Sequence, residues 1–174
     1  MKQLVLALAF VVATVIAGGC GYHVSGHADL LPATIKTIAI PAVSNLTNRY
    51  KLSDRLAATL TREFISRTRY RIVTDPAQAD AVLRAAVINY YSYPVVSDQK
   101  TGRANSVQLS AILQINLTER STGKVLFTQP RMEVRQRYEI SVDQLEYFEE
   151  SDIALDRLSR EVAKSVVSAI LEAF

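Results

Sequence analysis

The chain has 174 residues, and its 20 Lys and Arg against 17 Asp and Glu give a formal net charge of +3. So small an excess of positive charge does not point to nucleic acid as a partner. With 49% hydrophobic residues the chain can build the core of one domain of common size. Its single cysteine excludes an intramolecular disulfide.

The first twenty residues, MKQLVLALAFVVATVIAGGC, have the layout of a secretory signal. Lys2 precedes an apolar run over 4–17, which is shorter than the ~20 residues that span a bilayer as a helix. The small residues 17–19 that lead into Cys20 resemble the lipobox of bacterial lipoproteins. In such proteins the cysteine thiol receives a diacylglycerol, the signal is cleaved before it, and the new N-terminus is acylated.

We therefore predict a cleaved signal over 1–19, lipid attachment at Cys20, a tether over 20–34 and a single α+β domain over 35–174. Two alternatives stay open: Cys20 as an ordinary residue near a signal-peptidase site, or an uncleaved anchor. Lipidation is favoured because a free thiol is a liability in an oxidising compartment. Several acyl chains also hold a protein at a membrane more firmly than one.

The first half of the domain reads as strand, helix, strand. Residues 35–40 alternate apolar and polar positions and end at Pro41, which predicts a strand followed by a loop over 41–50. An amphipathic helix is predicted from Ser53 to about Thr68, with Ser53 near its start. Its apolar positions recur every four residues, at Leu52, Leu56, Leu60 and Phe64. A short strand over 70–73 follows.

The second half reads as three strands and a helix. Strands are predicted over 81–96, over 107–118 and from 125 towards 138, joined by polar turns at 97–103 and 121–124. Pro130 interrupts the last of these strands or marks it as a sheet edge. Ser151 is expected to cap a helix that runs to Phe174, with the acids of 149–152 near its positive end.

Two helices with one apolar stripe each must bury those stripes on a common surface. The predicted fold class is therefore α+β: a two-layer sandwich with both amphipathic helices on one face of a mixed, mostly antiparallel sheet of four to five strands. The first strand–helix–strand unit suits parallel pairing.

Charges are distributed unevenly along the chain. Residues 49–71 hold seven bases against two acids, and residues 143–156 hold six acids and no base. Such segments form faces that meet different partners or each other, or they are simply solvated.

The chain shows no pattern typical of an enzyme. His23 and His27 both fall in the tether with no acid or cysteine cluster to complete a metal site. No nucleotide-binding or nucleophile motif occurs. We expect no catalytic residue, no metal and no cofactor, and interpret the chain as a binding or assembly protein.

Two features suit binding. The turn 97–103 carries Lys100 and Arg103 at a predicted hairpin tip, where cations suit phosphate or carboxylate groups. An ordinary solvated turn is the simpler explanation of the same residues. Tyr90 and Tyr91 are adjacent on a strand and point to opposite faces, so one of them, with Tyr93 nearby, is exposed or covered by a partner.

Together the segments CGYHVSG, LLPATIKTIAIPAVSNLTNRY, RTRYRIV and DPAQADAVL resemble the lipopolysaccharide-assembly lipoproteins (LptE, formerly RlpB). Membership would imply two helices on a mixed sheet, and a lipid-anchored outer-membrane protein facing the periplasm. It would plug the β-barrel that translocates lipopolysaccharide, assist the assembly of that barrel, and contact lipopolysaccharide itself. Of the family's functional residues only Cys20 carries over, whereas Lys100 and Arg103 are inferred from their chemistry.

Two other classes compete with this interpretation. An auxiliary outer-membrane lipoprotein of a different lipid-trafficking transporter would share Cys20 and the fold but have another membrane partner. A periplasmic enzyme or carbohydrate-binding module would need a site that the sequence does not show.

Overall fold

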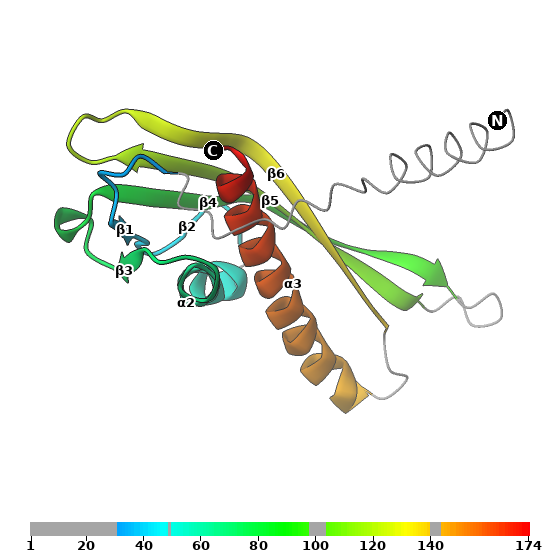
Figure 1. Ribbon diagram of the computed structural model, residues 1–174. Helices are drawn as coiled ribbons and strands as arrows, with labels where there is room; N and C mark the ends of the chain where they lie inside the picture. The colour runs from blue at the N-terminus through cyan, green and yellow to red at the C-terminus, as the bar shows by residue number, and fades with distance from the viewer. Residues whose placement is uncertain (1–30, 49, 98–103, 140–143) are drawn as a thin grey trace, which may run out of the picture.

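The structure is a computed structural model that describes residues 31–48, 50–97, 104–139 and 144–174. Six strands, two α-helices and one short 3₁₀ helix follow each other in the described part of the chain (Figure 1). They are β1 (Thr37–Ala39), β2 (Ser44–Asn45), α2 (Tyr50–Arg67), β3 (Arg71–Val73), η1 (Pro76–Gln78), β4 (Ala81–Ser97), β5 (Ala104–Glu119), β6 (Val125–Glu139) and α3 (Gln144–Glu172).

The predicted α+β class is confirmed, with more strands than expected. The strands form one mixed sheet in the order β3-β1-β4-β5-β6, and β2 pairs with β4 beside this path. The sixth strand is β2, which lies within the segment 41–50 that the sequence predicts as a loop. A strand of two residues is too short to show the alternation of apolar and polar positions by which strands are recognised in a sequence.

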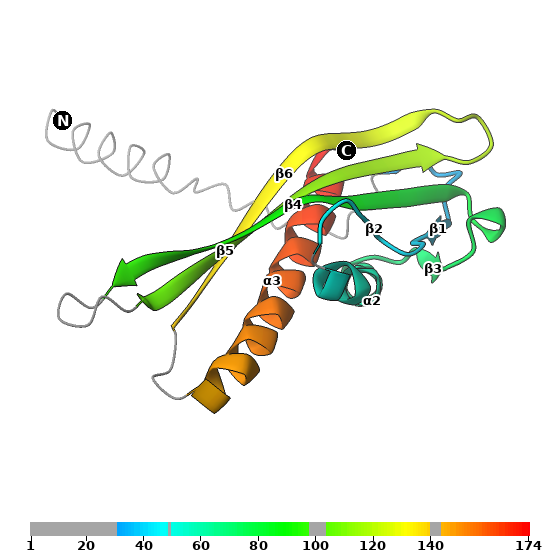
Figure 2. The ribbon, with the colours of Figure 1, turned by 180° about the vertical axis from the view of Figure 1, so that it is seen from behind.

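Two kinds of strand pairing divide the sheet. β1 pairs in parallel with both β3 and β4, and α2 supplies the crossover that parallel neighbours require. β4, β5 and β6 form an antiparallel meander of 17, 16 and 15 residues. These strands are so long that the meander extends well beyond α2 (Figures 1 and 2).

The core lies between the sheet and the two helices. Alternate residues of β4 and β5, such as Leu83, Val87 and Leu113, are fully buried in one cluster with the apolar stripes of α2 and α3. On the helices the fully buried side chains include Leu52, Leu56, Leu60, Phe64, Leu158, Val162, Val166 and Ile170. Both predicted stripes therefore pack on the same face of the sheet.

Both helices begin earlier than predicted. α2 begins at Tyr50, and the Ser53 hydroxyl donates to the Tyr50 carbonyl at 2.7 Å inside the first turn. α3 begins at Gln144, so Ser151 lies two turns inside it and does not cap it. The expectation that the acids of 149–152 lie at the positive helix end is therefore wrong. Residues 144–150 hold Gln, Leu and Glu, which favour helix, so nothing stops the helix from starting before Ser151.

A β-bulge decides which tyrosines face the helices. The register of β4 against β5 shifts between Val87 and Asn89, so one extra residue reverses the side-chain alternation beyond that point. Tyr90 consequently packs against the core, while Tyr91 is 48% and Tyr93 43% exposed on the opposite face. The prediction that adjacent tyrosines part to opposite faces is confirmed.

Pro130 lies on an edge strand, which is one of the two alternatives that the sequence predicts. β6 is the last strand of the sheet, and its register against β5 shifts between the pairs Leu113–Met132 and Ile115–Gln129. A proline lacks the N–H of a regular ladder, and this irregularity accommodates it.

Asp80 ties the start of β4 to β1. Its Oδ2 accepts hydrogen bonds from the backbone N–H groups of Lys36 and Thr37, both at 2.9 Å. Arg120, in the turn between β5 and β6, donates its Nε to the Ala79 carbonyl at 2.6 Å. The hydrogen bond from Lys36 is the main reason that the pKa of Asp80 lies below its ordinary value; desolvation opposes this effect, and Thr37 and Arg120 add to it.

We predict that Asp80→Ala lowers the free energy of unfolding at neutral pH by about 1–3 kcal/mol, because two backbone donors lose their acceptor. Asp80→Asn keeps an acceptor oxygen without the charge and costs less. Since the native pKa is depressed, the stabilisation by the charge is complete above the unfolded-state value near 3.8 and is lost as the pH falls through the native value. Urea unfolding at neutral and acidic pH should show the gap between wild type and Asp80→Asn closing in acid. A gap that widens in acid would contradict this assignment.

Candidate functional site

The site residues that the sequence predicts lie outside the described residues. This holds for Cys20, for the tether histidines, and for Lys100 and Arg103. The strands that flank the last two are described, and their pairing continues to Ser97 and Ala104 at the end of the β4–β5 hairpin.

A cleft opens between β6 and α3 near that same end of the sheet. It has a volume of about 550 Å³, within the roughly 300–1,000 Å³ typical of ligand sites. Arg137, Tyr138 and Glu139 line it from β6, and Ile153, Ala154 and Arg157 line it from α3. Glu139 pairs with Ser106, and Ser97 pairs with Ala104, so the cleft lies at the end of the meander where β4 ends and β5 begins.

The chemistry of this cleft combines cations with an apolar wall. Within the described residues neither Arg137 nor Arg157 forms an ion pair. Tyr138 and Ala154 are buried in the core beside them. Unpaired guanidinium groups bind phosphate and carboxylate oxygens through paired N–H donors, while an apolar wall favours hydrocarbon. The cleft therefore suits an anionic amphiphile.

Sequence reasoning missed both arginines of this cleft. Arg137 and Arg157 are twenty positions apart, and only the return of α3 along β6 brings them together. The available signal was the basic composition of the last strand, RMEVRQR, which stands out once that strand is assigned.

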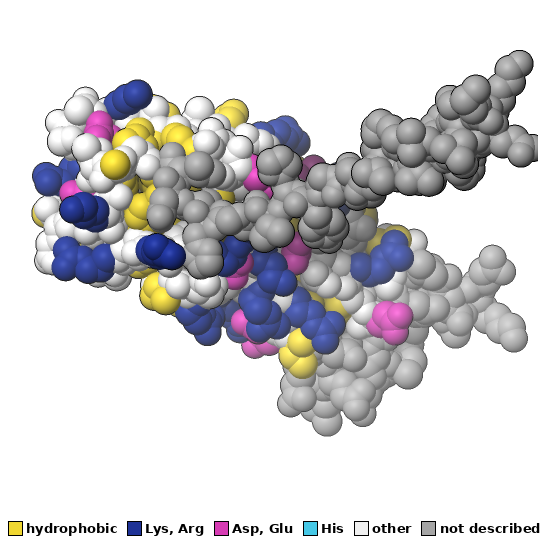
Figure 3. All heavy atoms as spheres, in the orientation of Figure 1, with side chains coloured by type: hydrophobic (Ala, Val, Ile, Leu, Met, Phe, Trp, Pro, Cys, Tyr) yellow, Lys and Arg dark blue, Asp and Glu magenta, His cyan; other side chains and the backbone are white. Residues whose placement is uncertain are grey.

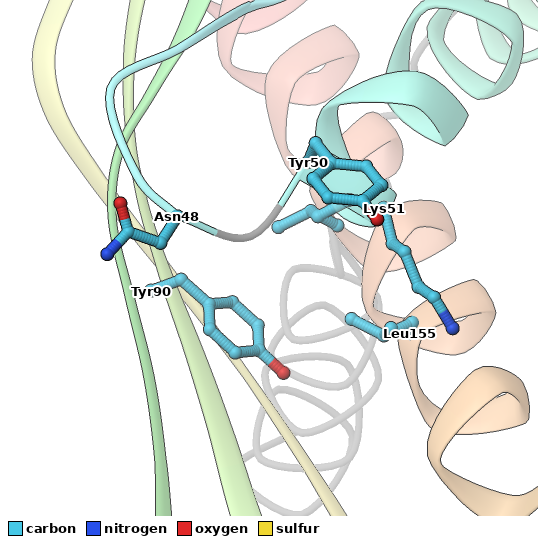
Figure 4. Close-up of a pocket in the computed structure, with 6 residues that line it drawn as sticks. Asn48, Tyr50, Lys51, Tyr90 and Leu155 are labelled. Carbon is cyan, nitrogen blue, oxygen red and sulfur yellow. The ribbon is translucent and has the colours of Figure 1, made fainter. Parts of the chain in front are cut away.

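A second, smaller cavity lies where α2 begins (Figure 4). Tyr90 reaches from β4 towards Leu155 of α3, and Tyr50 and Lys51 border the space from α2. Its volume of about 190 Å³ is below the range of ordinary ligand sites. The Lys51 ammonium is already paired with Asp152 at 3.2 Å. We interpret this cavity as a packing gap between the layers.

The positive and negative segments of the sequence meet at Asp152. Its carboxylate Oδ1 pairs with Lys51 at 3.2 Å and with Arg55 at 3.5 Å, and its carbonyl accepts from Arg55 at 2.8 Å. Of the three predicted alternatives, contact between the segments is confirmed at this point. Figure 3 shows Lys and Arg gathered over α2 and α3 with acidic side chains among them, a mixed-charge surface.

The sheet face opposite the helices carries a network of paired polar side chains. The Asn89 amide donates to the Tyr91 phenol oxygen at 2.7 Å, and the Gln108 amide donates to that of Tyr93 at 2.9 Å. Nearby, Glu133 Oε1 accepts from the Ser110 hydroxyl at 2.7 Å.

Arg135 completes this network. Its Nε donates to the same Glu133 oxygen at 2.8 Å. The hydrogen bond from Arg135, followed by that from Ser110, lowers the pKa of Glu133, and the bond to Glu133 raises the pKa of Arg135. Both groups are therefore fixed in their charged forms at neutral pH.

Comparison with models of protein families shows to which family the chain belongs. The model of the LptE family, described as lipopolysaccharide-assembly, matches residues 35–170. The chain belongs to the LptE family. The predicted resemblance is confirmed, and the family's role in lipopolysaccharide assembly agrees with the interpretation of the chain as a binding or assembly protein. Among curated proteins, none matches this LptE-family chain.

Solved structures share the fold of this LptE-family member at low sequence identity. The rare lipoprotein B of Shewanella oneidensis is 16% identical with a TM-score of 0.50, over 78% of this chain and 94% of that one. An uncharacterised lipoprotein B of Nitrosomonas europaea is 12% identical with a TM-score of 0.51, over 82% and 94%. A protein of Xanthomonas campestris is 14% identical with a TM-score of 0.53, over 82% and 89%.

Two further observations concern only the described part of the LptE-family chain. No group of three or more His, Cys, Asp or Glu residues there could hold a metal ion. None of the helices described there combines the length and the apolar character needed to cross a membrane.

We predict that Asp152→Asn lowers the free energy of unfolding by at most about 1 kcal/mol, because both ion pairs are partly exposed and screened by solvent. Arg55 keeps its hydrogen bond to the Asp152 carbonyl. Asp156→Asn, which removes an ion pair with Arg160 within α3, is the matched control. Urea unfolding at low and high salt measures both variants. A loss of several kcal/mol for Asp152→Asn alone would show that this contact holds the two helices together.

Proposed function

We propose that the protein is an outer-membrane lipoprotein, held on the periplasmic side by acylated Cys20, that partners and plugs the β-barrel through which lipopolysaccharide is translocated. It assists the assembly of that barrel and the insertion of lipopolysaccharide into the outer leaflet. The observation that carries this proposal is the family match over residues 35–170. The signal-like segment that ends at Cys20 supports the membrane attachment.

The distal end of the meander supports a direct contact with lipopolysaccharide. That ligand joins phosphate groups to acyl chains. Lys100 and Arg103 lie in the segment that links β4 and β5, and the cleft with Arg137 and Arg157 lies beside the same end. Cations on a hairpin next to a cation-lined apolar cleft match both parts of such a ligand.

The partnership is tested by isolating the protein from detergent-solubilised outer membrane and identifying what accompanies it. A large outer-membrane β-barrel at equal stoichiometry is the expected result. Isolation with a different lipid transporter, or without any barrel, would contradict the role as a plug.

We predict that Cys20→Ser abolishes incorporation of a radiolabelled fatty acid and releases the protein from membranes, because the only thiol that can carry a diacylglycerol is gone. Labelling followed by gel electrophoresis and fractionation measures both effects. Ala17→Ser, a small-residue change before the cleavage site, is the control that keeps the label. A labelled Cys20→Ser variant would overturn the anchor.

We predict that Lys100→Glu with Arg103→Glu weakens lipopolysaccharide binding at least tenfold, because two cations become anions facing phosphate. Arg137→Glu with Arg157→Glu should act in the same direction if the cleft takes part. Arg62→Glu with Arg69→Glu changes the charge equally on or beside α2 and should leave binding unchanged. Binding to immobilised lipopolysaccharide measures the effect, with circular dichroism to verify folding. Equal loss in all three variants would indicate unspecific attraction and contradict a site at the distal end.

A further inference from the structure

The sheet face opposite the helices differs in composition from the helical face. We call it the open face and define it by Arg84, Asn89, Tyr91 and Tyr93 of β4, Gln108, Ser110, Ile112, Gln114 and Asn116 of β5, and Glu133, Arg135 and Arg137 of β6. Arg137 pairs with Gln108 and also borders the cleft beside α3, because β6 is the edge strand. Among these described residues there is no lysine and no aspartate, and arginine and tyrosine predominate among the large side chains. Enrichment in Tyr and Arg with depletion of Lys and Asp is typical of the centre of a protein–protein interface.

The helical face also carries arginines, but it mixes them with lysines and with more acids. Its exposed or half-exposed charged residues include Lys51, Asp54, Arg62, Asp156, Arg160, Glu161 and Lys164. Lysines and acids in such a mixture are typical of a surface that stays in contact with water. Of the two broad faces that the described residues present, the open face therefore carries the features of an interface.

The hydrogen bonds of the open face orient its donors outward. Each of the phenol oxygens of Tyr91 and Tyr93 accepts from a neighbouring amide, so its own O–H proton is directed to a further acceptor. Arg135 uses its Nε for Glu133, which leaves the terminal N–H groups of the guanidinium for another partner. Ser110 is only 1% exposed and lies beneath these larger groups, and its hydroxyl donates a hydrogen bond to Glu133.

This arrangement lowers the cost of binding. The side chains are held by the network before any partner arrives, so little rotamer entropy remains to be lost on association. The partner must offer acceptors, which means carboxylates and carbonyl oxygens placed opposite two phenols and one guanidinium.

We propose that the open face is the surface through which this protein docks on its membrane partner, against an acidic, acceptor-rich part of the polar inner wall of the β-barrel. The inference rests on the proposed function, because it takes its occupant from the barrel partnership. The interior wall of such barrels is polar, as the outward-directed donors require. The helical face then remains turned towards water in the lumen or the periplasm.

The test is co-isolation of the barrel with the full-length, membrane-anchored protein. Tyr91→Phe, Tyr93→Phe and Arg135→Gln together remove the two phenol O–H donors and the guanidinium charge and keep both aromatic rings. We expect the amount of co-isolated barrel to fall tenfold or more relative to wild type. Tyr50→Phe with Arg62→Gln makes the same kinds of change on α2, where Tyr50 is 68% exposed, and should leave the amount unchanged.

Each outcome decides the assignment. Loss of the barrel in the open-face variant alone supports the proposal. Full retention of the barrel in that variant, or loss only in the α2 variant, overturns it while the proposed function stands. Retention of the barrel together with weaker binding of delipidated core oligosaccharide assigns the face to saccharide and also overturns it. A wild-type protein that brings no barrel rejects the proposed function itself.

Discussion

The helices cover only one side of the long antiparallel meander, and the rest of the structure depends on this constraint. Two helices with one apolar stripe each can shield only one side of β4, β5 and β6. The other side must be stable without a hydrophobic cover, and it achieves this with hydrogen bonds that end at Glu133 and at the phenols of Tyr91 and Tyr93. The apolar layer therefore holds the fold together, and the uncovered layer is free to serve recognition.

The fold class follows from periodicity, but its details need tertiary contacts. Alternation in β1 and β5 and the four-residue spacing in α2 are local signals, so these elements are predictable. Ser53 and Ser151 mislead because serine is favoured at helix starts, yet it is tolerated inside a helix when its hydroxyl bonds back to a carbonyl, as that of Ser53 does. The bulge after Val87 leaves no mark in the sequence, and it alone turns Tyr91 and Tyr93 away from the helices.

The candidate site shows the same division between local and non-local signals. A polar segment with Lys100 and Arg103 between two strand-like runs can be recognised in the sequence because it is a local feature, and its role stays a prediction. The cleft of Arg137 and Arg157 cannot be recognised there, because it depends on the angle at which α3 returns along β6. Contact between the basic and acidic segments could be anticipated in kind, but the single residue that makes it, Asp152, could not.

The two edges of the sheet, β3 and β6, affect whether copies of the chain can associate through strand pairing. β3 offers only three residues, and the longer edge, β6, is interrupted by Pro130 at a shift in register. An unbroken, flat edge of fifteen residues would invite a second molecule to continue the sheet. A proline that withholds one donor and bends the strand discourages such polymerisation. The same residue that complicates the recognition of β6 as a strand thus disfavours edge-to-edge association between copies of this chain.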